Sequence, residues 1–217
     1  METKLLSKKS DELIIFLSGW GCDGGQFKNI ACRRDLLICW DYCDMSFDFD
    51  FSPYKKVWLI GYSAGVFAAG FIKDKLPKLA AAIAVNGNPL SMDKYYGIPP
   101  QTIAKFKGLN LDNYMAFRRD FLVISEEELK LFNQCPPSRS FESCFKEFDN
   151  IELLSAKPYP VLDFDYAIIS ECDKIFNPQR QKEYFKGRYR LLPNAAHNVF
   201  TLHFKSFDEI IDFALGK

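Results

Sequence analysis

Short continuous runs of apolar residues recur along the chain, and each run ends at small or polar residues. Runs of this kind, without alternation of apolar and polar positions, are typical of strands buried on both faces of a sheet. The pattern predicts strands over Leu13–Leu17, Asp35–Trp40, Lys56–Ile60, Leu79–Val85, Tyr166–Ser170 and Gly187–Leu192. Helical patterns cover Ala64–Lys75, Pro178–Phe185 and Phe204–Leu215. Strands that alternate with helices predict an α/β fold with a mostly parallel sheet and flanking helices.

The segment Leu90–Pro160 breaks this alternation. It has no clear strand pattern, but it contains helix-like stretches at Pro100–Lys107, Asp112–Val123 and Ser138–Phe148. An insertion of this length is too long for a structureless loop in a compact domain. We expect residues 90–160, approximately, to form a helical lid over the active site, within a single domain that spans residues 1–217.

The composition changes this picture little. A chain of 217 residues that is 48% hydrophobic can bury a sizeable core and is not typical of disorder. Lys+Arg and Asp+Glu are equal at 28 each, so nothing attracts the whole chain to nucleic acid or to a membrane. The apolar run Leu13–Leu17 is too short for a signal peptide, and no run reaches the length of a membrane span.

The chain has seven cysteines and no Cys-x-x-Cys pair, which predicts reduced, mostly buried thiols. Together with the missing signal peptide, this predicts a cytoplasmic protein. The sequence does not indicate an oligomeric state.

The sharpest local feature is Gly61-Tyr62-Ser63-Ala64-Gly65, which matches Gly-x-Ser-x-Gly. It lies between a predicted strand and a predicted helix, which is the context of the nucleophile elbow of α/β-hydrolases. The serine must project from a tight turn, and glycines at positions 61 and 65 remove side chains that would collide with the strand and the helix. The sequence therefore predicts Ser63 as a nucleophile. The alternative is an ordinary strand–helix junction in which Ser63 caps the helix.

A serine hydroxyl needs a base, and the chain has only two histidines. His197 lies in a loop directly after the last predicted strand, where α/β-hydrolases place the base. His203 lies at the start of the last predicted helix, where a structural or surface role is expected. Ala195 and Ala196 leave room for the His197 ring to approach the serine, so we predict His197 as the general base.

The base needs an acid to fix its tautomer. Asp173 follows the predicted strand Tyr166–Ser170, where the acid is expected, and Glu171 is the rival from the same turn. The alternative for Asp173 is a solvated loop carboxylate or a helix cap.

A tetrahedral intermediate also needs two N–H donors. We predict the backbone amides of Ala64, directly after the nucleophile, and of Trp20, in the loop after Leu13–Leu17. The Trp20 indole would also form a wall of the acyl pocket, and the alternative for this side chain is core packing. The chain has no Walker or dinucleotide-binding motif and no cluster of metal ligands, so we expect no metal and no cofactor.

Four short motifs stand together in this chain: Ser-Gly-Trp-Gly at 18–21, Gly-Tyr-Ser-Ala-Gly at 61–65, Asn-Gly-Asn-Pro at 86–89 and Asn-Ala-Ala-His at 194–197. With them, the chain resembles the BioG-type pimeloyl-[acyl-carrier protein] methyl ester esterases of biotin synthesis, over nearly its whole length. The resemblance implies an α/β-hydrolase fold and a serine carboxylesterase that removes the methyl ester of pimeloyl-acyl carrier protein through an acyl-enzyme on Ser63. Asp173 matches the acid of this family only by its position after a strand.

The resemblance also implies an acyl carrier protein as partner. Such carriers are acidic, so a basic patch is expected near the entrance of the site. Residues 100–119 carry one acidic residue, Asp112, and four basic residues: Lys105, Lys107, Arg118 and Arg119. We take Arg118 and Arg119 as candidate partner-binding residues, and the alternative is a solvated helix face.

Phe117 and Phe121 lie four residues apart, so the two rings can share one helix face. With Trp20, they are our candidate substrate-binding residues, and the alternative is that they hold the lid on the core. The identity of the acyl group depends on the shape of the pocket, which the residues of a triad do not define. A generic esterase or thioesterase acting on small esters or acyl-CoA, and a non-catalytic binding module with the same fold, therefore remain as alternative functions.

Overall fold

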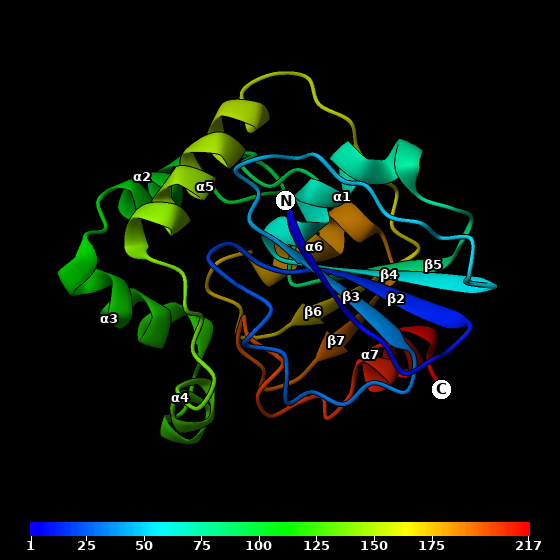
Figure 1. Cartoon of the computed structure of the whole chain (residues 1–217). Coiled ribbons are helices and arrows are strands. Elements are labelled where there is room, and N and C mark those ends of the chain that lie inside the picture. The colour runs from blue at the N-terminus through cyan, green and yellow to red at the C-terminus, as the bar shows by residue number, and fades with distance from the viewer.

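The computed structural model describes residues 1–217, apart from the side chain of Met115. Its strands form one sheet in the order β1-β3-β2-β4-β5-β6-β7 (Figure 1). The strands are β1 (Glu2–Leu6), β2 (Glu12–Leu17), β3 (Asp35–Trp40), β4 (Lys56–Tyr62), β5 (Leu79–Val85), β6 (Tyr166–Ser170) and β7 (Tyr189–Leu192). Strand β1 pairs with β3 in antiparallel fashion, and every other pair of neighbours is parallel. The predicted mostly parallel sheet is therefore confirmed.

Helices cover both faces of this sheet. They are α1 (Ala64–Ile72), α2 (Pro100–Lys107), α3 (Leu111–Leu122), α4 (Glu126–Phe132), α5 (Phe141–Ser155), α6 (Pro178–Phe185) and α7 (Phe207–Leu215). Successive side chains of β2 enter two different cores, because side chains alternate across a strand. Ile14 and Phe16 pack on the side of α7, whereas Leu13, Ile15 and Leu17 pack on the side of α1 and α6. This burial on both faces explains why the strands appear in the sequence as continuous apolar runs.

Two elements escaped the sequence pattern. Strand β1 is an edge strand whose residues are mostly exposed, so it has no continuous apolar run. Helix α4 is short and begins with three glutamates, so it has no clear apolar face. Its start does carry one sequence signal, a serine directly before it, since serine is a preferred N-cap residue. In the structure the Ser125 side chain accepts a hydrogen bond from the backbone N–H of Glu128.

Several predicted helix ends were wrong. Helix α5 spans Phe141–Ser155 rather than Ser138–Phe148, and helix α3 lies one residue earlier than predicted. Helix α1 ends at Ile72, and a 3₁₀ turn at Lys73–Lys75 follows it. Helix α7 begins at Phe207 rather than Phe204, because Ser206 caps it by accepting from the N–H of Glu209. His203 therefore lies in the turn before the helix, not at its start.

The predicted helices of residues 90–160 are present between β5 and β6. Figure 1 shows α2, α3, α4 and α5 grouped to one side of the sheet, away from α7. Aromatic side chains of this segment share a core cluster with residues 175–176 and with Trp20. The insertion is thus joined to the carboxyl edge of the sheet, where the loops after β2, β4 and β6 meet. Along the described chain, every helix is too short or too polar to cross a bilayer.

The backbones of α1 and β2 approach each other very closely at Gly65, in the first turn of α1. A Cβ atom at this position would lie 2.0 Å from the carbonyl oxygen of Leu17, at the end of β2. Because backbone atoms on both sides would have to move, we expect Gly65→Ala to lower the free energy of unfolding by about 3 kcal/mol, as overpacking does. Gly108→Ala is the matched control, since its Cβ would meet nothing closer than 3.5 Å. Urea denaturation of both variants measures the difference, and equal stabilities would contradict this account of the contact.

Candidate active site

Ser63 lies in a sharp turn between β4 and α1. Its backbone has φ 54° and ψ −119°, a left-handed conformation that is strained for a residue with a side chain. Hydrogen bonds hold the turn on both sides: the N–H of Ser63 donates to Val85 O on β5, and the N–H of Val66 donates to Ser63 O, both at 3.0 Å. The Ser63 side chain makes no capping hydrogen bond to α1, so the alternative of a helix cap is wrong. The hydroxyl instead projects toward the loops of the sheet edge.

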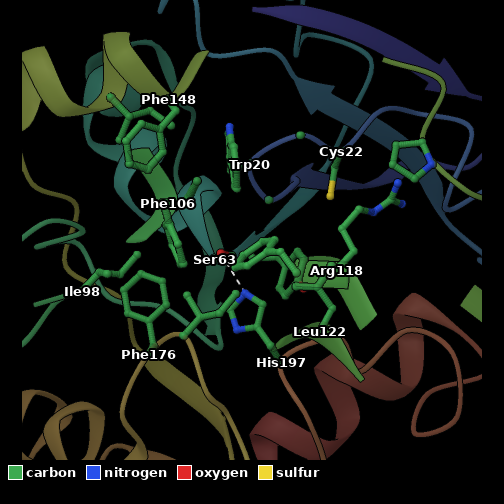
Figure 2. A pocket seen from close by; sticks show the side chains of 18 of the residues that line it. Trp20, Cys22, Ser63, Ile98, Phe106, Arg118, Leu122, Phe148, Phe176 and His197 are labelled. Carbon is green, nitrogen blue, oxygen red and sulfur yellow. Dashed lines mark hydrogen bonds between the residues drawn. The ribbon is translucent and has the colours of Figure 1, made fainter. Parts of the chain in front are cut away.

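His197 lies within hydrogen-bonding distance of this hydroxyl. Its Nε2 atom is 3.0 Å from Ser63 Oγ, and Figure 2 shows this contact as a dashed line. On the other side of the ring, Nδ1 is 2.9 Å from Oδ2 of Asp173 and 3.0 Å from Oδ1. Because a carboxylate only accepts, Nδ1 carries the proton and Nε2 is left as an acceptor for the serine O–H. The imidazole thus lies between the serine and the aspartate, and its Nε2 atom is placed to accept the proton of the Ser63 hydroxyl.

Asp173 is held firmly in this chain of hydrogen bonds. Its side chain is fully buried, and Oδ1 accepts from the backbone N–H groups of Ile175 at 2.8 Å and Phe176 at 3.0 Å. Glu171, the rival from the same turn, is exposed, and its own N–H donates to Leu192 O. The structure therefore brings Asp173, and not Glu171, to the imidazole.

The His197 ring is buried between aromatic side chains. It is 2% exposed, with the ring of Tyr62 at 5.2 Å and the ring of Phe176 at 6.2 Å between centroids. His203, the other histidine, lies elsewhere, with Nε2 at 3.7 Å from the carboxylate of Glu128 on α4. The packing around His197 restricts its ring to the orientation that faces Ser63.

Sequence reasoning missed one polar residue of this site, Asn86. It follows β5 directly, has φ 46° and is fully buried. Its amide nitrogen donates to His197 O at 2.7 Å and to Ser170 Oγ at 2.8 Å, while its Oδ1 accepts from the N–H of Ser170. Asn86 thus links the ends of β5 and β6 to the loop that carries His197. Its motif, Asn-Gly-Asn-Pro, was visible in the sequence, but the partners of the amide were not.

The candidate oxyanion donors lie beside Ser63. A Cβ atom on Gly19 would lie 3.3 Å from Ser63 Cβ, so the loop after β2 runs directly alongside the serine. Within the described residues, the hydrogen bonds of the chain use neither the backbone N–H of Trp20 nor that of Ala64. Both groups therefore remain as donors for a bound oxygen, and their catalytic role stays a prediction.

A cavity of about 60 Å³ opens beside Ser63 and His197. Figure 2 shows Ile98, Phe106, Phe148 and Phe176 on one side of Ser63 and Cys22 and Arg118 on the other. Burial raises the pKa of the Cys22 thiol to about 12, so at neutral pH this thiol is uncharged and is no rival nucleophile.

The predicted substrate-binding side chains lie in different places. Trp20 and Phe117 line the cavity, and the indole N–H of Trp20 donates to Cys144 O at 2.5 Å. Phe121 is absent from the lining of the cavity and stacks on Phe117, with centroids 4.9 Å apart.

The two arginines predicted to bind a partner differ in their exposure to solvent. The guanidinium of Arg118 lies over the ring of Phe132, 4.8 Å from its centroid, and this residue is 7% exposed in the cavity wall. The side chain of Arg119 is 55% exposed and pairs with Asp120 at 2.8 Å. Of the two, Arg119 is the one that faces solvent.

No group of three or more His, Cys, Asp or Glu side chains among the described residues is placed to hold a metal ion.

A parallel sheet with a serine on a strained strand–helix turn, facing a histidine and an aspartate, defines the chain as an α/β-hydrolase. Solved structures agree: a lipase-esterase related protein from Clostridium acetobutylicum matches over 98% of both chains, with a TM-score of 0.64 at 15% identity, which shows the fold. The family model described as "Pimeloyl-ACP methyl esterase BioG" matches residues 1–210. The chain belongs to this BioG family.

Individual relatives support the assignment. The crystal structure of BioG from Haemophilus influenzae matches with a TM-score of 0.85 at 27% identity, over 96% of this chain and 99% of that one. An uncharacterised protein from the same species is 32% identical over 212 residues, which cover 93% of this chain and 95% of that protein. A protein from Bacteroides fragilis named malonyl-[acyl-carrier protein] O-methyltransferase is 34% identical over 180 residues, but these residues are only 36% of its length. Family membership supports an esterase role for the chain.

We expect Asn86→Asp to lower ester turnover at least about 10-fold. The change keeps the shape of the side chain, and aspartate also tolerates a backbone with positive φ. It replaces the donor that faces His197 O by an acceptor. A buried group left without its hydrogen bond lowers the free energy of unfolding by about 1–3 kcal/mol. The kcat on a small methyl ester, taken at a temperature where the variant is folded, measures the effect. Asn194→Asp is the matched control, because Asn194 also has a positive φ, 52°, but is exposed in the same loop region. Equal losses in both variants would show that the Asn86 amide does not hold the histidine loop.

Proposed function

We propose that this protein hydrolyses the methyl ester of pimeloyl-acyl carrier protein, with Ser63 as nucleophile, His197 as general base and Asp173 as the acid that orients it. The observation that carries the proposal is the chain of hydrogen bonds from Ser63 Oγ through His197 to Asp173, in a member of the BioG family.

The first half of the reaction forms an acyl-enzyme. Ser63 Oγ attacks the ester carbonyl carbon while its proton passes to His197 Nε2. The carbonyl oxygen becomes an oxyanion, which the backbone N–H groups of Trp20 and Ala64 stabilise. Asp173 stabilises the imidazolium that forms. When the intermediate collapses, the C–O bond to the methoxy group breaks, and His197 returns the proton so that methanol leaves.

The second half releases the acid. Water donates a proton to His197 Nε2 as its oxygen attacks the acyl carbon, and the same two N–H groups stabilise the second oxyanion. Breakage of the bond to Ser63 Oγ, with proton return from His197, restores the serine and frees the carboxylic acid on the carrier.

The cavities support an acyl chain of this kind. The cavity beside Ser63, called the inner cavity here, has a volume of about 60 Å³. Benzene occupies a cavity of roughly 150 Å³ in an engineered protein, and the pimeloyl chain is larger than benzene. The inner cavity by itself is therefore too small for the whole chain. An adjoining cavity of about 450 Å³ shares Cys22, Tyr62 and Leu122 with the inner one and reaches exposed residues of the surface. We infer that the chain runs from Ser63 into this adjoining cavity, with its carrier at the surface.

The carrier partner is supported by the family description and by the name of the Bacteroides relative, both of which include an acyl carrier protein. That relative is named as a methyltransferase, and a methyl ester on a carrier-bound acid is the product that such an activity makes. Arg119 is one turn of α3 from Leu122, which lines both cavities, so its exposed cation is near the route of the chain.

Exchange of the base tests the mechanism. We expect His197→Gln to lower turnover of pimeloyl-carrier methyl ester by about 10³-fold or more, because general-base catalysis is lost. His203→Gln, which changes the other histidine of the chain, should keep turnover within about twofold. Methanol release and mass spectrometry of the carrier measure both variants, and a fluorophosphonate probe should label Ser63 in the wild type. A wild type that releases no methanol from this substrate would end the specific proposal.

Charge reversal tests the partner. Arg119→Glu should lower kcat/KM for the carrier-bound substrate about 3- to 10-fold while turnover of dimethyl pimelate stays unchanged, because a charge at the rim acts on the encounter with an acidic protein. The loss should shrink at high salt, since exposed charges are screened. Lys55→Glu is the control, because Lys55 is 83% exposed at the opposite end of β4. Equal losses on both substrates, or none on either, would favour a generic esterase.

A further inference from the structure

A buried carboxylate of the insertion contacts the loop that carries Trp20. Glu147, on α5, is completely buried, and its Oε2 accepts from the backbone N–H of Gly21 at 3.0 Å. Its Oε1 accepts from the N–H of Tyr42, in the loop after β3, at 2.9 Å. One side chain thus binds two loops of the sheet edge that are distant in the sequence.

The negative charge of Glu147 is balanced within the protein. Nη1 of Arg139 lies 2.6 Å from Oε2, and this arginine is 7% exposed and also pairs with Asp41 at 3.2 Å. Burial raises the pKa of the Glu147 carboxyl, while Arg139 and the two backbone N–H groups oppose the rise. Among the described residues, the groups that bind the carboxylate are all donors: two backbone N–H groups and the guanidinium of Arg139. Such an arrangement favours the ionised form.

The same loop is held at two further points. The Tyr42 hydroxyl donates to Ser18 O at 2.7 Å, and the Trp20 indole donates to Cys144 O of α5. Gly21 itself has φ 70°, so the peptide after Trp20 is turned in a way that few residues adopt. The loop therefore has fixed partners before, at and after Trp20, and α5 supplies two of them.

From these contacts we propose that Glu147 is a positioning residue for the oxyanion hole: it fixes the turn at Gly21 and so aims the N–H of Trp20 at the oxygen of the substrate. This inference rests on the proposed function.

The test uses the ratio of kcat/KM for an oxoester and for the thionoester of the same acid and alcohol. Sulfur in place of the carbonyl oxygen accepts hydrogen bonds weakly, so this ratio reports the contact with the oxyanion donors. Glu147→Gln should lower kcat on the oxoester at least 10-fold, leave KM within about twofold and reduce the ratio at least 10-fold.

Two further variants keep the outcome interpretable. Glu147→Gln removes the buried carboxylate that faces Arg139, which leaves the arginine only its pair with the partly exposed Asp41, so this variant can fail to fold. Glu147→Gln/Arg139→Gln removes both charges and should show the same fall in the ratio. Glu152→Gln is the control, since Glu152 lies on α5 and pairs with Lys107 at the surface. Its ratio should equal that of the wild type.

The results separate the two claims. A folded double variant with a lower melting temperature but an unchanged ratio would overturn the positioning role and leave Glu147 as a purely structural residue. A wild type that releases no methanol from pimeloyl-carrier methyl ester would instead overturn the proposed function.

Discussion

The arrangement of the site depends on one backbone conformation, the left-handed turn at Ser63. With φ at 54°, the chain reverses between β4 and α1 so sharply that the hydroxyl projects beyond the sheet edge, 3.0 Å from His197 Nε2. A turn this tight forces the start of α1 against the end of β2, where a Cβ on Gly65 would meet the Leu17 carbonyl. The surrounding sheet must therefore hold the strain, and it does so through hydrogen bonds to β5 and within α1.

The parallel sheet explains why residues so distant in the sequence meet. Strands β2, β4, β5 and β6 run in the same direction, so the loops that follow them emerge at one edge. Those loops supply Trp20, Ser63, Asn86 and Asp173, in that order along the chain. The His197 loop follows β7, at the end of the same sheet, and Asn86 joins it to β5 and β6 by one buried amide.

The insertion between β5 and β6 contributes in two ways. Its aromatic residues on α2 and α3 form walls of the cavity beside Ser63. Its last helix, α5, is joined to the loops after β2 and β3 by the buried pair of Glu147 and Arg139. A buried charge without a partner is costly, so the position of α5 in which Glu147 meets Arg139 and the two loops is favoured over positions that separate them.

The sequence by itself determined the strand runs, the parallel sheet and the residue types of the candidate site. This was so because burial on both faces leaves continuous apolar runs, and because a nucleophile elbow needs small residues at fixed spacing. Strand β1 and helix α4 stayed hidden, since an exposed edge strand and a short acidic helix have no such pattern. Only the tertiary structure decided between Asp173 and Glu171, separated Arg118 in the cavity wall from Arg119 in solvent, and gave partners to Asn86 and Glu147. Those distinctions depend on which groups meet across the fold, and a single chain of residues does not encode such distances locally.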